Sequence, residues 1–105
     1  MVEDKKRIHN FEDIRRYVTE TLSSFELLQP KISQLTCNLL SRKGQACGVY
    51  FCLHGPRAVR LTAIWETDAN SILFYGSCGN RLQRTRLLEA PKLEVQAVDN
   101  LLSAA

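Results

Sequence analysis

The spacing of the hydrophobic residues changes at Pro30, and this change constrains the fold more than any other feature of the chain. Before Pro30, apolar residues recur every three or four positions, as on one face of an α-helix: Phe11, Ile14, Val18, Leu22 and Phe25. Pro30 ends this pattern because it lacks an amide proton and restricts the residue before it. The pattern predicts a helix over residues 11–27 with Asn10 as its N-cap.

After Pro30 the apolar residues follow the period of two that is typical of β-strands. Residues that favour turns separate five such segments: 33–41, 46–54, 58–67, 72–77 and 81–89. Short turns make successive strands antiparallel. We therefore expect an α+β fold in which an amphipathic N-terminal helix packs on a five-stranded antiparallel β-meander over residues 33–89.

The length of 105 residues suits one domain, which we expect to extend over residues 1–105. Residues 1–9 are polar, and we expect them to be flexible. The tail over residues 92–105 has no clear periodicity, so its structure is left open.

Side chains alternate along a strand, so the positions of the turns decide which residues share a face of the sheet. We centred the turns on Gly55-Pro56, Ala69-Asn70 and Gly79-Asn80. One face is then almost wholly apolar, and we expect the helix to pack on it: Tyr50, Cys52, Val59, Leu61, Ala63, Trp65, Ile72 and Phe74. The opposite face mixes apolar groups with arginines: Val49, Phe51, Leu53, Arg60, Thr62, Ile64, Glu66, Leu73, Tyr75, Leu82, Arg84 and Arg86.

One helix covers only one face, so something else must cover the mixed face: the C-terminal tail, a second copy of the chain or another partner. Arginine and aromatic residues among apolar groups are enriched at protein interfaces. We therefore expect self-association or binding of a protein partner through this face. The candidate interaction residues are Phe51, Arg60, Ile64, Tyr75, Arg84 and Arg86.

The alternative ligand of this face is a single-stranded nucleic acid or another polyanion. Such ligands bind aromatic platforms that are flanked by cations. Residues 28–88 carry eight basic and two acidic side chains, a local net charge of +6. The sequence contains no RNP-type or KH-type motif, which makes this alternative the weaker one.

Metal binding and catalysis have little support in the sequence. Cys37, Cys47, Cys52, Cys78 and His54 lack the short ligand spacing of a structural zinc site, so we expect no metal or other cofactor. Cys52 and His54 share a face, but a thiol among apolar groups is unreactive. We therefore expect a protein that is not an enzyme.

The expected location is the cytoplasm. No apolar run approaches the ~20 residues that cross a bilayer, so we expect no membrane association. The first residues are charged and are not followed by the apolar segment of a secretory signal.

Two segments resemble a group of small uncharacterised proteins of planctomycete-type bacteria. The first is Gly55-Pro56-Arg57-Ala58-Val59-Arg60-Leu61-Thr62-Ala63-Ile64-Trp65, and the second is Phe74-Tyr75-Gly76 with the glycine turn that follows it. The resemblance implies a bacterial cytoplasmic protein, and no activity is attached to that group.

Overall fold

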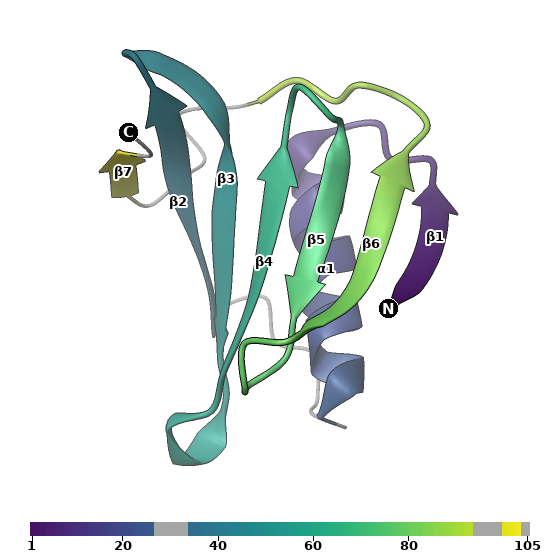
Figure 1. Ribbon diagram of the computed structural model, residues 1–105, viewed down its shortest axis with the longest axis vertical. Coiled ribbons are helices and arrows are strands. Elements are labelled where there is room, and N and C mark those ends of the chain that lie inside the picture. The colour runs from purple at the N-terminus through teal and green to yellow at the C-terminus, as the bar shows by residue number, and fades with distance from the viewer. Residues whose placement is uncertain (27–33, 94–99, 104–105) are drawn as a thin grey trace.

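The computed structural model describes residues 1–26, 34–93 and 100–103. It contains one α-helix and a mixed sheet of seven strands in the order β1-β6-β5-β4-β3-β2-β7 (Figure 1). The elements are β1 (Val2–Lys6), α1 (Phe11–Phe25), β2 (Leu35–Arg42), β3 (Gln45–His54), the short 3₁₀ turn η2 (Pro56–Ala58), β4 (Arg60–Glu66), β5 (Ser71–Tyr75), β6 (Arg81–Leu87) and β7 (Asn100–Ser103). The predicted α+β class is confirmed.

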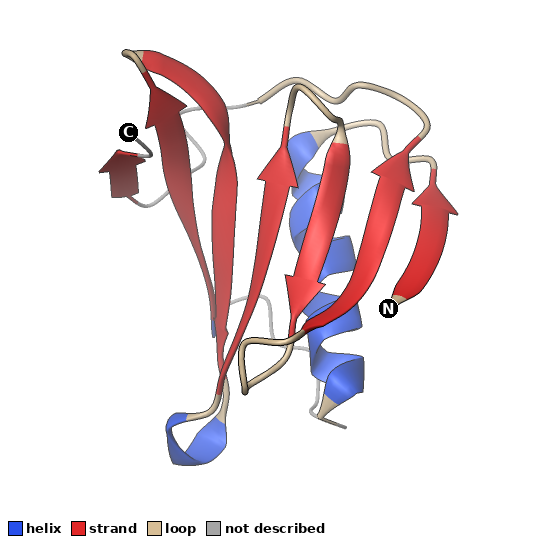
Figure 2. Cartoon of the chain, in the orientation of Figure 1, coloured by secondary structure: helices blue, strands red, loops and turns tan. Residues whose placement is uncertain are grey.

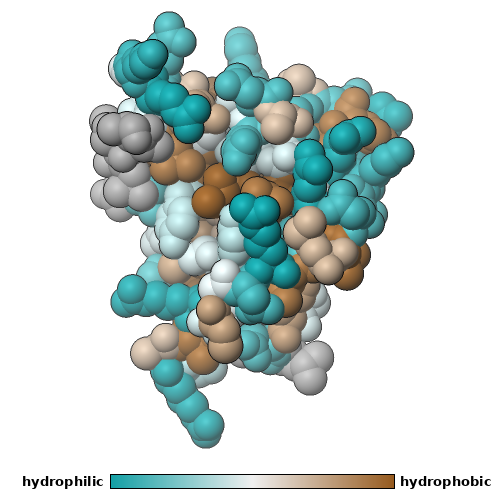
Figure 3. Space-filling view, in the orientation of Figure 1, coloured by the Kyte–Doolittle hydropathy of each residue, from teal (hydrophilic) through white to brown (hydrophobic). Residues whose placement is uncertain are grey.

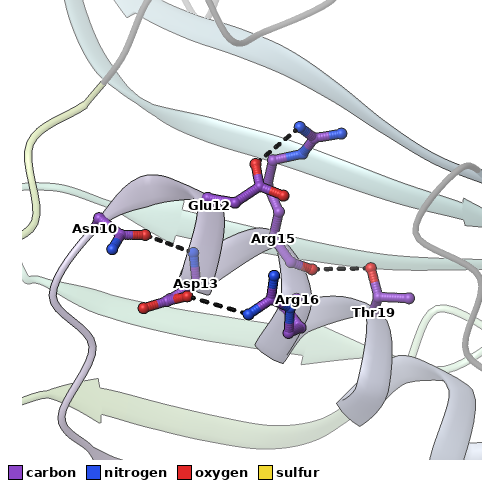
Figure 4. A network of polar contacts seen from close by, with 6 residues as sticks. All are labelled: Asn10, Glu12, Asp13, Arg15, Arg16 and Thr19. Carbon is purple, nitrogen blue, oxygen red and sulfur yellow. Dashed lines mark hydrogen bonds and ion pairs between the residues drawn. The ribbon is translucent and has the colours of Figure 1, made fainter.

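The helix α1 begins where the sequence predicted. The side-chain oxygen of Asn10 accepts a hydrogen bond of 2.8 Å from the backbone N–H of Asp13, which satisfies one unpaired donor of the first turn (Figure 4). The exposed side of the helix carries two ion pairs of spacing i,i+3, between Glu12 and Arg15 and between Asp13 and Arg16. The helix ends at Phe25, and residue 27 of the predicted helix lies outside the described residues.

The core lies between α1 and one face of the sheet, and the helix lies entirely on that side (Figure 2). Phe11 from the helix packs against Phe51 and Trp65, with ring centroids 6.2 and 6.1 Å apart. Tyr17 and Phe25 both meet Phe74 edge to face. The predicted helix stripe therefore faces the sheet, as its spacing requires.

Strands β2 to β6 form the predicted antiparallel meander. The β2–β3 turn consists of Lys43 and Gly44, whose φ angles of 52° and 78° suit a two-residue hairpin. The observed strands differ from the predicted ones by at most two residues at either end. Residue 33 of the first predicted strand lies outside the described residues.

The prediction of a wholly antiparallel five-stranded sheet is wrong at both edges. Residues Val2–Lys6, which we expected to be flexible, form β1 and pair in parallel with β6. In the tail, whose structure the sequence does not predict, Asn100–Ser103 form β7 and pair in parallel with β2. All five side chains of β1 are exposed, so this strand has no apolar alternation by which the sequence could predict it.

The prediction for β3 placed its side chains on the wrong faces. Val49, Phe51 and Leu53 are buried in the core beside α1, and Phe51 is 0% exposed. Their pairing partners on β4 face α1 as well, since Phe51 pairs with Ala63. Tyr50 and Cys52 of β3 therefore lie on the face away from the helix, opposite to the prediction.

The cause of this error is the loop between β3 and β4. The N–H of Gly55 donates to the carbonyl of Val59, which closes a five-residue loop centred on Arg57 and not on Gly55-Pro56. Every pairing partner of β3 moves by three residues as a result. An odd shift exchanges the two faces of a strand.

Candidate interaction face

We call the sheet face opposite α1 the open face. In Figure 1 the helix lies behind the sheet, so Figure 3 looks onto the open face from the same direction and shows hydrophobic side chains at its centre among hydrophilic ones. The pairing registers place these residues of β2 to β6 on it: Thr36, Asn38, Leu40, Tyr50, Cys52, His54, Arg60, Thr62, Ile64, Glu66, Leu73, Tyr75, Arg84 and Arg86.

Two rows of paired residues cross the centre of the open face. In the first row Tyr50 pairs with Ile64, Ile64 with Leu73, and Leu73 with Arg84. In the second row, Cys52, Thr62 and Tyr75 are paired in the same way. The large apolar and aromatic side chains of both rows are half-buried although the helix lies on the other side.

The described part of the tail does not cover the open face. Residues 88–93 follow β6, and Leu93 packs against the core cluster, which is on the helix side. Strand β7 continues the sheet beside β2 and does not cross it. Among the described residues, the centre of the open face has therefore no covering element (Figure 3).

The charged groups of the open face lie around its apolar centre. Arg60 and Glu66 are exposed at the two ends of β4, Arg84 is half-buried on β6, and Arg86 is exposed further along β6. The one cation that lies over an aromatic ring in the described parts of the chain is Lys6, 5.6 Å from the centre of the Tyr17 ring on the helix side. The arginines of the open face thus do not stack on its tyrosines.

Burial changes the acid–base chemistry of Tyr50 and Cys52. Desolvation raises the pKa of the Tyr50 phenol and a nearby Cys52 raises it further, whereas a hydrogen bond with Thr62 and the charge of Arg60 act in the opposite direction. Desolvation also raises the pKa of the Cys52 thiol, against the smaller effect of Arg60. The thiol is therefore neutral at pH 7, which makes it a poor nucleophile.

His54 contacts a side chain of the neighbouring strand β2. Its Nε2 lies 3.3 Å from the hydroxyl of Thr36, and this hydroxyl also donates to the carbonyl of Cys52 at 3.4 Å. The side chains of His54 and Cys52 share a face, as the sequence predicted, but this face is the open face and not the apolar face on which Cys52 was expected. The raised pKa of the thiol argues against its activation by this histidine.

The predicted interaction residues are only partly brought together. Arg60, Ile64, Tyr75, Arg84 and Arg86 lie on the open face, whereas Phe51 is in the core and is removed from the candidate site. Tyr50 replaces it at the centre of the face. The sequence does predict that Tyr50 lies on a strand and faces away from its neighbour Phe51. Which of the two faces the helix depended on the length of the loop after β3.

The described residues contain no group of three or more His, Cys, Asp or Glu side chains that could hold a metal ion. In the same parts of the chain, no helix is both long and apolar enough to span a membrane.

Comparison of the chain with known protein families, with curated proteins and with solved structures found no match. The candidate function therefore has to be argued from the open face itself.

Proposed function

We propose that this protein is a non-enzymatic interaction module that self-associates through its open face. The observation that carries the proposal is the pair of half-buried rows around Ile64, for which the described residues provide no cover. Apolar side chains with an arginine and aromatic residues among them have the composition of an interface centre. A second copy would remove these side chains from water, and this burial would stabilise the dimer.

The size of the open face supports this use. A stable interface buries about 800 Å² on each partner. The molecule measures 35 × 27 Å along its two longer axes in the view onto the open face (Figure 3), so its outline can accommodate a contact of this size. Two sheets can pack face to face at a separation of about 10 Å when their side chains interdigitate.

The distribution of charge favours a protein over a nucleic acid. Glu66 lies on the open face, and the register of β1 places Glu3 beside Arg84. A phosphate backbone would meet repulsion from both carboxylates.

The oligomeric state tests the proposal. We expect sedimentation velocity to show a dimer at micromolar concentration and a monomer after Ile64→Glu, which places a charge in the central row. Val2→Glu is the matched control, because Val2 is exposed on the helix side of β1 and should leave the dimer intact.

Thr62→Lys provides a second disruptive variant, because Thr62 is polar and half-buried and its replacement should spare the fold. Circular dichroism would establish that each variant is folded. A wild-type chain that stays monomeric at high micromolar concentration would overturn self-association.

Binding of single-stranded nucleic acid is the second candidate, and it is favoured by Arg84, Arg86 and Tyr75 on one face. It predicts a change in the fluorescence anisotropy of labelled oligonucleotides at low salt. Arg84→Ala and Tyr75→Ala should each weaken that binding. The absence of any change at low salt would exclude this candidate.

A further inference from the structure

Strand β4 is the middle strand of the seven-stranded sheet, and its charge pattern is self-complementary. Its side chains on the open face are Arg60, Thr62, Ile64 and Glu66. The two charged residues are exposed at opposite ends of the strand, about 20 Å apart for six residues of extended chain. Neither forms an ion pair within the described parts of the chain.

A dimer in which both copies use the same face has a two-fold axis, and only the direction of this axis is open. If the axis runs along β4, it places Arg60 over Arg60 and Glu66 over Glu66, so that like charges meet at both ends. If it runs across β4, the strand of one copy lies over the reversed strand of the other. Each Arg60 then faces a Glu66.

We infer that two copies pack face to face about a two-fold axis that crosses β4 at Ala63, and that Arg60 of each copy pairs with Glu66 of the other. This arrangement rests on the proposed self-association and specifies its geometry. Opposite charges attract across an interface, and the juxtaposition of like charges disfavours the alternative axis. The two reciprocal ion pairs thus select the orientation of the copies.

The same axis also matches the two central rows. Because Ala63 lies midway between Thr62 and Ile64, rotation about it places the row of Ile64 in one copy over the row of Thr62 in the other. The bulkier side chains of the first row, Tyr50 and Leu73, then meet the row that contains Cys52 and Tyr75. Arg86, two strands away from β4, remains at the hydrated rim.

Charge reversal with mixing tests this geometry. In a dimer of Arg60→Glu, the new glutamate of each copy would face Glu66 of the other copy. In a dimer of Glu66→Arg, the new arginine of each copy would face Arg60 of the other copy. We expect each single variant to raise the dimer dissociation constant about tenfold or more at low salt. An equimolar mixture of the two variants should form a heterodimer within about threefold of the wild-type affinity, because both of its pairs are again complementary.

The double variant Arg60→Glu with Glu66→Arg should likewise regain the wild-type affinity. Glu20→Arg makes the same charge change as Glu66→Arg, but on the exposed side of α1. It is the control and should leave the dissociation constant unchanged. Thermal unfolding of every variant by circular dichroism would separate loss of the dimer from loss of the fold.

Two outcomes would overturn the inference, and they are distinguishable. If the wild type dimerises but the single variants leave the dissociation constant unchanged, as an axis along β4 requires, or if mixing does not restore the affinity, the reciprocal pairing is wrong and the proposed self-association stands. If the wild type is monomeric, both are wrong.

Discussion

The indole N–H of Trp65 donates a hydrogen bond of 3.4 Å to the side-chain oxygen of Asn70, five residues along the chain. The amide nitrogen of Asn70 in turn donates to the carbonyls of Leu87 and Glu89, at 3.4 and 2.8 Å. This asparagine lies in the β4–β5 turn with a positive φ of 47°. One side chain therefore connects the buried Trp65, the turn and the end of β6.

Replacement of Asn70 should separate its two roles. Asn70→Ala loses the three hydrogen bonds and places an alanine in the left-handed region, so we expect a loss of about 2–4 kcal/mol in the free energy of unfolding. Asn70→Gly loses the same bonds but tolerates the backbone conformation, and should cost about 1 kcal/mol less. Urea denaturation followed by Trp65 fluorescence would measure both. Equal losses would contradict a role of the backbone angle.

Gly48 should be intolerant of any side chain. A Cβ atom at this position would lie 2.2 Å from the carbonyl oxygen of Trp65 on the paired strand, and neither backbone can yield without disturbing the β3–β4 ladder. We expect Gly48→Ala to cost about 1–3 kcal/mol of unfolding free energy, or more.

Gly79→Ala is the comparison for Gly48→Ala. Gly79 has a φ of +82° and open space around its Cα, so alanine there meets only backbone strain of about 1–2 kcal/mol. Calorimetry of the two variants would measure the loss of unfolding free energy at each glycine. A Gly48→Ala protein as stable as the wild type would show that the two strands are further apart than we describe.

The N-cap of α1 should contribute measurably to stability. Asn10→Ala removes the acceptor of the Asp13 N–H and should lower the unfolding free energy by about 1 kcal/mol. Asn10→Ser keeps an oxygen in the capping position and should restore most of the loss. Chemical denaturation of the three proteins tests this, and identical curves for the alanine and serine variants would argue against capping.

The raised pKa values of Cys52 and Tyr50 predict a loss of stability at alkaline pH. Both groups become charged on losing a proton, and both retain that proton to higher pH in the folded chain than in the unfolded chain, where they titrate near their ordinary values of 9.0 and 10.0. Their contribution to stability is therefore complete below about pH 9 and is lost as the pH rises above it.

We expect the unfolding free energy to fall with rising pH above pH 9, and Tyr50→Phe to make that fall less steep. Urea denaturation at several pH values measures both slopes. A variant with the same slope as the wild type would show that the Tyr50 phenol titrates alike in the folded and unfolded chains. Tyr75→Phe is a matched tyrosine control on the same face.

The candidate site was predictable wherever the observed pairing register differs from the predicted one by an even number of residues, because such a shift keeps each side chain on its face. The β4–β5 pairs Thr62–Tyr75 and Ile64–Leu73 lie two residues from the predicted register, so Ile64 and Tyr75 stayed on their predicted face. The same holds for Arg84, which pairs with Leu73. The shift of three residues between β3 and β4 was odd, and it exchanged Phe51 for Tyr50.

The sequence by itself determined the helix and the five strands of the meander, because their signals are local: an apolar stripe of helical period, an N-cap and residues that favour turns. The edge strands β1 and β7 depended on the tertiary structure. Their parallel partners are far away in the sequence, and the exposed side chains of β1 follow no apolar pattern.

The tertiary structure also decided which side chains the open face presents. Each strand of a meander is recognisable from its own residues, but its orientation depends on the pairing register, which the loop geometry sets. Arg57, with a φ of 59°, lies at the centre of the β3–β4 loop, and the register set by this loop places Tyr50 beside Ile64. The change of period at Pro30 thus predicts a helix and a sheet, while one loop of five residues determines which side chains of β3 lie on the open face.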